Sequence, residues 1–389
     1  MTREYPPEVY GGAGVHVDHL ARVLREHVDL SVLCWGEPRP DATAYRAWDA
    51  LAGDQPYLAA LRALSINLRM VTGAEAADLV HSHTWYAQLA GHLAKLVHDV
   101  PHVTTVHSLE PLRPWKEEQL GGGYHLSGFA ERSGLEHADA VIAVSEHVRD
   151  DVVDCYPVVD ADRVHVIYNG VSIDEYSPDA AIDALERYGV EPDVPTVVFV
   201  GRVTHQKGVT HLLEAAHSFD PDVQLVLCAG APDTPALAAD TERRVERLQE
   251  ERGNVIWIEA MLPRTEVVQL LTHATVFACP SIYEPQGIVN LEAMACETAV
   301  VASATGGIVE VVEDGQTGLL VPLEHSDDGS MEPRDPTAFA AAFAERVNEL
   351  VRDPARAEAM GQAGRRRAID HFSWEVIGAQ TVDLYRCLV

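Results

Sequence analysis

The sequence has 389 residues, more than one ordinary hydrophobic core accommodates, and it therefore predicts two domains. Hydrophobic residues make up 47% of the chain and charged residues 23%, a composition that excludes an intrinsically disordered protein. The 60 acidic residues against 29 basic ones give a formal net charge of −31, which excludes nucleic acid as a favoured partner.

The sequence indicates neither a membrane segment nor a cysteine-based site. No apolar run approaches the roughly 18 residues of a membrane span. The first residues lack the apolar region of a signal peptide, so we expect a cytoplasmic protein. The six cysteines include no C-x-x-C pair, which argues against both a zinc knuckle and a disulfide framework.

Short β-branched runs alternate with amphipathic helical stretches along the first half of the chain. This alternation predicts an α/β fold with a parallel sheet covered by helices. The strands expected in this half are Leu30–Trp35, Leu79–His83, His102–His107, Ala140–Ser145 and Val164–Tyr168.

The same alternation continues in the second half and predicts a second doubly wound, Rossmann-like domain. The turn-rich segment 169–178 closes the first set, and residues 192–195 precede the second, so we expect a hinge near 170–195. The strands expected here are Thr196–Gly201, Gln224–Ala229, Val255–Glu259, Thr275–Cys279, Ala299–Ala302 and Gly318–Val321.

The last segment predicts an amphipathic helix that begins after Ser373, a favourable N-cap residue. Apolar and aromatic side chains recur at helical spacing and predict a buried face. They are Ile377, Thr381, Leu384, Tyr385 and Leu388.

A glycine turn at residues 11–14 leads directly into a helix whose apolar face begins at Val17. Backbone amides at a helix start, together with the helix dipole, favour a phosphate. A turn with a purely structural role explains the same residues about equally well.

Two cations, Arg202 and Lys207, follow the strand expected at 196–201. In open α/β sheets ligands bind beyond the carboxyl ends of the strands, so both residues lie where an anion would bind. The alternative is a pair of solvated surface cations. Lys95, Lys116 and Lys207 are the only lysines, which makes that alternative the weaker one.

Glu284 and Glu292 follow a later strand, the first in a loop and the second about two turns along the next helix. Both carboxylates can therefore face one ligand, while amides near Gly287 point at an anion from the helix start. Glutamates at this spacing also arise by chance, and the alternative for Glu284 is an interaction with the helix dipole alone. One strand later, residues 305–307 supply another glycine turn at the same sheet edge.

The spacing from Glu284 to Glu292 resembles the E-x7-E signature of the retaining glycosyltransferases of family 4. Arg202 and Lys207, each beside a glycine, resemble the diphosphate clamp of that family. Nearly the whole chain is covered, since the glycine motifs fall in the expected order. They are Gly11-Gly12, Asn169-Gly170-Val171 and Thr305-Gly306-Gly307.

Within the family, segments 2–16 and 81–86 are similar to the short actinobacterial and archaeal glycogen synthases, a branch that includes α-maltose-1-phosphate synthases. The resemblance implies a GT-B fold, in which two Rossmann-like domains face each other across a cleft. The C-terminal helix then crosses back to the N-terminal domain. The implied boundaries are 1–170 for an acceptor domain, 171–370 for a donor domain and 371–389 for the returning helix.

The same resemblance implies a hexosyltransferase that retains anomeric configuration and needs no metal. Its donor would be ADP-glucose or UDP-glucose. The new α-1,4 bond would be made to glucose 1-phosphate or to the end of glycogen or another α-glucan.

The resemblance also assigns roles to individual residues. Arg202 and Lys207 would hold the diphosphate, Glu292 the ribose hydroxyls and Glu284 the donor sugar. His107 matches a histidine beside the reacting glucose. Backbone groups would complete the donor site at Gly11, Gly12, Gly287, Ile288, Val289, Thr305, Gly306 and Gly307.

The loop expected after His107 offers candidates for the acceptor. Arg113 and Lys116 would meet a phosphorylated acceptor and Trp115 would stack on a sugar, although a solvated loop is the alternative. Compared with the longer glycogen synthases, Tyr10 replaces a lysine and Thr84 an aspartate. The apolar strand that precedes residue 2 in the family also has no counterpart in this sequence.

Metal binding is the weaker interpretation of the histidines and aspartates. His81 and His83 share a strand face, which suits a metal, but without a clear third ligand we favour acceptor binding by His83 or core packing. The D-x-D triplets at 160–162 and 220–222 precede strands, so we place them at the amino ends of the sheets, away from the ligand edge.

Two other functions fit the same architecture. A nucleotide-sugar 2-epimerase would release nucleotide without an acceptor. A non-catalytic nucleotide-sugar sensor would not need the cations that hold the leaving group. The oligomeric state, a homodimer included, stays open at this point.

Overall fold

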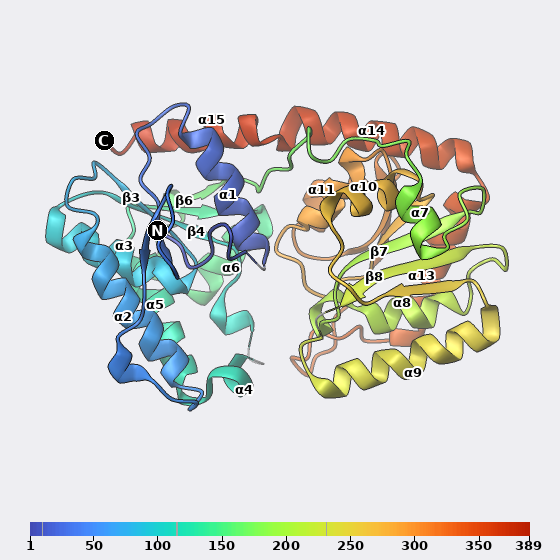
Figure 1. Cartoon of the computed structure of the whole chain (residues 1–389), viewed down its shortest axis with the longest axis horizontal. Coiled ribbons are helices and arrows are strands. Elements are labelled where there is room, and N and C mark those ends of the chain that lie inside the picture. Colours follow the sequence, from blue (N-terminus) through green and yellow to red (C-terminus); the bar gives the residue numbers. More distant parts are fainter. Residues whose placement is uncertain (10, 114–115, 231) are drawn as a thin grey trace. The chain divides into compact units, whose positions relative to one another are not determined.

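The computed structural model describes residues 1–9, 11–113, 116–230 and 232–389 (Figure 1). The chain divides into two compact units. The first unit comprises Met1–Gly170 and Trp374–Val389, and the second comprises Val171–Ser373. Every pairing between the strands of these described residues is parallel, which confirms the predicted α/β class.

The second unit contains a six-stranded sheet in the order β12-β11-β10-β7-β8-β9. Counted from β7 this is the order 6-5-4-1-2-3, the doubly wound Rossmann arrangement, and the winding reverses between β7 and β10. Ligands of such sheets bind at that switch point. The strands are β7 Thr196–Arg202, β8 Gln224–Gly230, β9 Val255–Ile258, β10 Val276–Cys279, β11 Ala299–Ala304 and β12 Gly318–Pro322.

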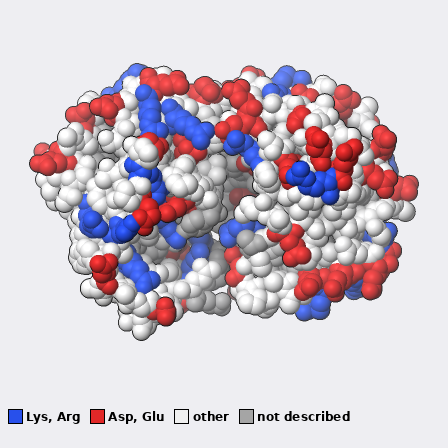
Figure 2. Space-filling view, viewed as in Figure 1, with Lys and Arg blue, Asp and Glu red and all other residues white. Residues whose placement is uncertain are grey.

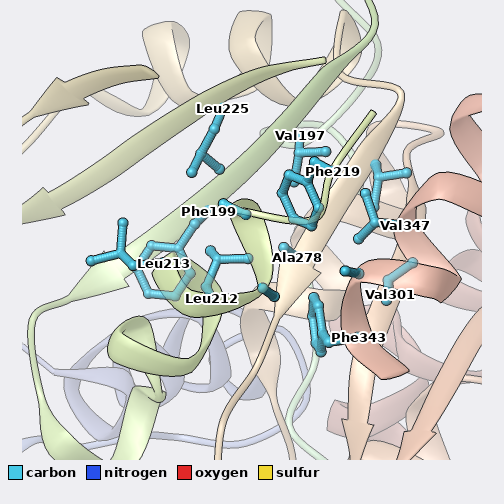
Figure 3. Packing of buried hydrophobic residues seen from close by; sticks show 14 of the residues in the cluster. Val197, Phe199, Leu212, Leu213, Phe219, Leu225, Ala278, Val301, Phe343 and Val347 are labelled. Atoms are coloured by element: carbon cyan, nitrogen blue, oxygen red, sulfur yellow. The ribbon is translucent and has the colours of Figure 1, made fainter. Parts of the chain in front are cut away.

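Helices cover this sheet and bury its side chains on both faces, which is why its strands are continuous apolar runs. Figure 3 shows Phe199 beside Leu212 and Leu213, and Val301 near Phe343. All five are almost fully buried. The helices are α7 Asp183–Tyr188, α8 Val209–Ala216, α9 Pro235–Arg252, α10 Arg264–Thr272, α11 Ile288–Ala295, α12 Ile308–Val311, α13 Pro336–Val351 and α14 Pro354–Phe372.

The first unit contains a four-stranded sheet in the order β3-β4-β5-β6 and, apart from it, the pair β1-β2. The prediction that all the strands of this half form one sheet is therefore wrong. The backbone of Met1 and Thr2 bridges the two sheets, because His83 donates to Met1 and Thr2 donates to Leu33. The strands are β1 Leu33–Trp35, β2 Thr43–Tyr45, β3 Val80–His83, β4 His102–Val106, β5 Ala140–Ala143 and β6 Val164–Val166.

The C-terminal helix α15, Trp374–Arg386, packs against α1, Gly12–Leu24, within the first unit (Figure 1). Leu20 and Ile377 share one apolar cluster, and Gly378 lies so close to Val23 that an added Cβ would be 2.3 Å away. The other helices of this unit are α2 Leu58–Thr72, α3 Trp85–His98, α4 Lys116–Leu120, α5 Tyr124–His137 and α6 Glu146–Cys155.

The segment after His107 is not the long loop that the sequence predicts. It forms the 3-10 turns η2, Glu110–Leu112, and η3, Gly121–Gly123, with α4 between them. Trp115 lies outside the described residues, as does Tyr10. Among the described residues no helix is both long enough and apolar enough to cross a membrane.

Candidate functional site

The loops that follow β7 and β10 meet at the switch point of the second unit. Ile282 donates its amide to the carbonyl of Gln206 over 2.9 Å. Gly208 adopts a φ of +63°, and an added Cβ there would lie 2.1 Å from the carbonyl oxygen of Pro280. Only glycine permits both this conformation and this close approach. The two loops are therefore locked together.

This approach brings Lys207 to Glu284. The Lys207 Nζ donates to Glu284 Oε2 over 2.6 Å, and Ser281 Oγ donates to the same oxygen over 3.3 Å. Burial is the largest single influence and would lower the pKa of Lys207, but the charge and hydrogen bond of Glu284 together with the influence of Cys279 outweigh it, and the pKa is raised. An ammonium has three donors, so this pairing does not exhaust Lys207.

The loop after β11 supports the other side of Glu284. Gly307 donates its amide to the Glu284 carbonyl over 3.0 Å, and Thr305 Oγ1 donates to the Ile282 carbonyl over 3.4 Å. Gly306 has a φ of +52°, and an added Cβ would lie 2.0 Å from the Glu284 oxygen. The predicted turn at 305–307 thus fixes the backbone of Glu284.

Helix α11 begins at the same edge of the sheet. Gly287, with a φ of +94°, precedes it, and the amides of Ile288 and Val289 form its first turn. Glu292 lies further along and is hydrogen-bonded with Tyr176. Burial raises the pKa of Glu292 to about 7, against the smaller opposing effects of Tyr176 and Lys207.

Arg202 ends β7 but takes a more exposed position than Lys207. Its side chain is 55% exposed and pairs with Asp233 over 3.3 Å. The structure therefore pairs Lys207 with Glu284, places Glu292 near enough for the charge of Lys207 to influence its pKa, and leaves Arg202 at the rim of the group.

The first unit brings together His16 on α1, His83 at the end of β3 and His107 directly after β4. His83 Nδ1 lies 3.3 Å from His107 Nε2, and the His16 and His107 rings are 4.7 Å apart. Burial lowers the pKa of His16 and His83 well below the usual value, and that of His107 to about 4. The three rings are therefore neutral at pH 7.

His16 was not selected from the sequence, although a signal existed. It lies four residues before Leu20 and eight before Leu24, so it shares the buried face of α1 with them. A polar residue at a buried helical position is the kind of exception that marks a site.

A carboxylate of the chain itself is bound at the glycine turn before α1. The Glu4 carboxylate accepts from the Gly11 amide over 2.9 Å, and an added Cβ at Gly14 would lie 2.5 Å from Glu4 Oε2. The Gly11 amide is engaged while this bond persists, so Gly12 at the first helical position is the stronger candidate for a ligand.

Arg113 and Lys116 do not lie in an open basic loop. Arg113 donates to Ser108 Oγ over 2.8 Å and lies 3.7 Å from the Glu110 carboxylate, while Lys116 donates to Gln119 over 2.8 Å. Arg113 is nevertheless close to His107 in sequence and only partly exposed, so it remains an acceptor candidate.

Both D-x-D triplets lie at the amino ends of strands, as predicted. Asp160 caps the turn that precedes β6, and Asp220 precedes β8 and pairs with Arg352. Neither is at the edge that carries Lys207 and Glu284.

Comparison with known proteins decides the family. Residues 10–175 match the model of glycosyltransferase family 4, and residues 180–367 match that of the glycosyl transferases group 1. An alpha-maltose-1-phosphate synthase of Mycolicibacterium smegmatis is 56% identical over 99% of this chain and 98% of its own length. The chain belongs to glycosyltransferase family 4. An enzyme of the same name from Mycobacterium tuberculosis is 54% identical over 99% of this chain and 98% of its own.

Among solved structures, the family 4 chain resembles a sucrose-phosphate synthase from Thermosynechococcus elongatus. The TM-score is 0.78 at 26% identity, with 99% of this chain and 95% of that one covered. The GT-B fold and the hexosyltransferase activity expected from the sequence are thereby confirmed.

The chemistry of this family 4 site follows from its charges. A nucleotide diphosphate gains negative charge as its bond to the sugar breaks. Lys207 and the amides at the start of α11 supply positive potential at one point, and Glu284 and Glu292 supply hydroxyl acceptors beside it. The switch point is thus suited to a sugar nucleotide.

Proposed function

We propose that this enzyme transfers a glucosyl group from ADP-glucose to glucose 1-phosphate with retention of configuration, forming α-maltose 1-phosphate and ADP. The observation that carries the proposal is the convergence of Lys207, Glu284 and the start of α11 at the switch point. The acceptor follows from the relatives at 56% and 54% identity, both named alpha-maltose-1-phosphate synthase.

The leaving diphosphate is held by Lys207, with Arg202 at the rim and the α11 amides completing the set. These groups interact more strongly with the departing diphosphate than with the intact donor, because the charge there increases in the transition state. Fixed cations and peptide dipoles thus do what a divalent metal does in other transferases, and we propose that no metal is required.

Two carboxylates orient the donor. Glu292 accepts from the ribose hydroxyls and Glu284 from hydroxyls of the glucose. Because Glu284 Oε2 is already bonded by Lys207 and Ser281, we favour same-face attack assisted by the leaving phosphate over a covalent intermediate on Glu284.

The first unit supplies the groups for the glucose and the acceptor. His107, neutral because partial burial lowers its pKa to about 4, donates or accepts a hydrogen bond to the reacting glucose. Arg113 receives the phosphate of glucose 1-phosphate, since a guanidinium matches phosphate geometry. Lys116, Gly12 and His83 remain predictions at this site.

The proposal is tested by incubating the protein with ADP-glucose or UDP-glucose, each with glucose 1-phosphate or glycogen, and identifying the products. We expect acceptor-dependent release of ADP and formation of α-maltose 1-phosphate. Glucan elongation without that product would contradict the acceptor, and nucleotide release without any acceptor would indicate a 2-epimerase.

The leaving-group role is tested with Lys207→Ala against Lys95→Ala. Lys95 forms an ion pair of similar length, 2.7 Å with Asp139, in the first unit. Loss of a transition-state contact predicts that kcat/KM falls at least about a hundredfold for Lys207→Ala. Lys95→Ala should keep near-parental kinetics. Equal kinetics in both variants would refute the assignment.

A further inference from the structure

Three histidines of the first unit form a cluster that the proposed reaction does not fully use. His16, His83 and His107 each contribute one ring nitrogen to a group whose members all lie within 4.8 Å of one another. We propose that this three-histidine cluster binds a transition-metal dication such as Zn²⁺, and that the bound ion inhibits the enzyme.

The spacing of the nitrogens fits tetrahedral coordination. Zinc binds imidazole nitrogen at about 2.0–2.1 Å, so two ligands at the tetrahedral angle lie roughly 3.4 Å apart. His83 Nδ1 and His107 Nε2 are 3.3 Å apart. The His16 nitrogen lies within 4.8 Å of the other two, so closing the third side requires it to move by roughly 1.5 Å at most.

His16 is the member whose environment calls for an explanation. Its side chain is only 3% exposed, and apart from an interaction with the Asn169 side chain, no hydrogen bond from the described residues reaches its ring nitrogens. Such a buried polar group is destabilising unless it finds a partner. A metal ion would satisfy one nitrogen, and the side chain of Asn169 stands beside the ring to orient the other.

The neighbouring groups define which ions the cluster takes. His81 stacks on His83, but its ring nitrogens are engaged by Tyr385 and Thr105, so it is not a ligand. Among the described residues no carboxylate joins the cluster. Three imidazoles favour Zn²⁺, Co²⁺, Ni²⁺ or Cu²⁺ over Mg²⁺ or Ca²⁺, and they leave a fourth position open.

The ion can reach the cluster through His107, which is partly exposed while His16 and His83 are buried. Inhibition follows if His107 acts on the reacting glucose, because its Nε2 would then be held by the metal. That second step rests on the proposed function, whereas metal binding does not.

Binding is tested by titrating the full chain with Co²⁺ in the absence of substrate and recording its visible absorption. We expect one Co²⁺ per chain with the intense bands of tetrahedral coordination, displaced by Zn²⁺ and abolished by EDTA. His16→Gln should weaken binding at least tenfold. His19→Gln is the matched control, since His19 lies on the same helix and stacks on Trp374 outside the cluster.

A different group of histidines lies in the second unit, where Glu332 bonds both His205 and His211. His205→Gln should leave the cobalt spectrum unchanged. Should His16→Gln fail to fold by circular dichroism, His107→Gln takes its place in the binding assay. Parental affinity in the cluster variants, or only octahedral spectra, would overturn the site.

The inhibitory step is tested by adding Zn²⁺ to the acceptor-dependent assay and then adding EDTA. We expect at least a tenfold loss of rate that EDTA reverses, with His19→Gln equally sensitive. Tetrahedral Co²⁺ binding without inhibition by Zn²⁺ would overturn the inhibitory step and also the placement of His107 beside the glucose, while leaving the metal site established.

Discussion

Glu292 and Glu284 share a sequence motif but not an environment. Glu284 is paired with Lys207, whereas Glu292 is hydrogen-bonded with Tyr176 and carries a pKa raised to about 7 by burial. The carboxylate form is the better acceptor for ribose hydroxyls. Under the role that we propose for Glu292, donor binding therefore depends on pH near neutrality.

We expect the affinity for ADP-glucose to increase up to about tenfold between pH 6 and pH 8, because Glu292 ionises over this range. Glu292→Gln should bind more weakly and without this dependence, as isothermal titration calorimetry would measure. Glu297→Gln, just beyond the end of the same helix, is the control that should keep the parental profile. By linkage, the raised pKa also means that the stability contribution of Glu292 falls as pH rises from about 4.5 to 7.

Among single residues, charged side chains could be selected from the sequence more readily than residues whose role depends on contacts made in the fold. Lys207, Glu284 and Glu292 stand out because cations and paired carboxylates at strand ends are chemically conspicuous. His16 does not, because its role depends on β3 and β4 bringing His83 and His107 beside α1. The sequence also does not indicate that the Glu4 carboxylate accepts a hydrogen bond from the Gly11 amide.

At the scale of elements, the site depends on the contact between the loops after β7 and β10. Gly208→Ala should displace this contact, since the added Cβ would lie 2.1 Å from the Pro280 oxygen. We expect donor affinity to fall at least tenfold, with a further loss of stability beyond the roughly 1–2 kcal/mol of a positive φ.

Gly253→Ala is the matched control for Gly208→Ala. Gly253 has a φ of +78° at the end of α9, but an added Cβ would meet no atom of the described residues within 4 Å. Gly253→Ala should lose only the stability that a positive φ costs, as thermal unfolding would measure. Its affinity for the donor, measured by calorimetry, should be unchanged. Equal effects of the two substitutions would show that the loop contact does not matter.

The strands that sequence predicted best are those buried on both sides. All six of the second unit were located to within two residues, because runs such as residues 197–200 are continuously apolar. β2 was missed since its three residues include exposed Thr43 and form no apolar run. The break between the two sheets of the first unit was missed because it depends on backbone bonds of Met1 and Thr2.

For the whole molecule, charge is the dominant feature. Acidic side chains are widespread on the face shown in Figure 2, with arginine and lysine scattered among them. The excess carboxylates that give the net charge of −31 repel one another across the surface. Salt shortens the range of that repulsion from about 10 Å at 0.1 M to about 3 Å at 1 M.

We therefore expect the thermal unfolding midpoint to rise when KCl increases from about 0.1 to 1 M at pH 7. The gain should shrink near pH 5, close to the sequence pI of about 4.8, because little net charge remains to be screened. A midpoint that is insensitive to KCl at pH 7 would show that repulsion between the surface charges does not limit the stability of the fold.

The chain leaves the first unit at Gly170 and re-enters it at Trp374, while Val171 and Phe372 hydrogen-bond to each other in the second unit. The second unit is thus topologically an insertion with adjoining ends. On the ribosome it is complete before α15 emerges, whereas α1 must wait for the last 16 residues to cover Leu20 and Leu24. The domain that is synthesised first is therefore the one that matures last, and it is exposed to chaperones and proteases for the longest time.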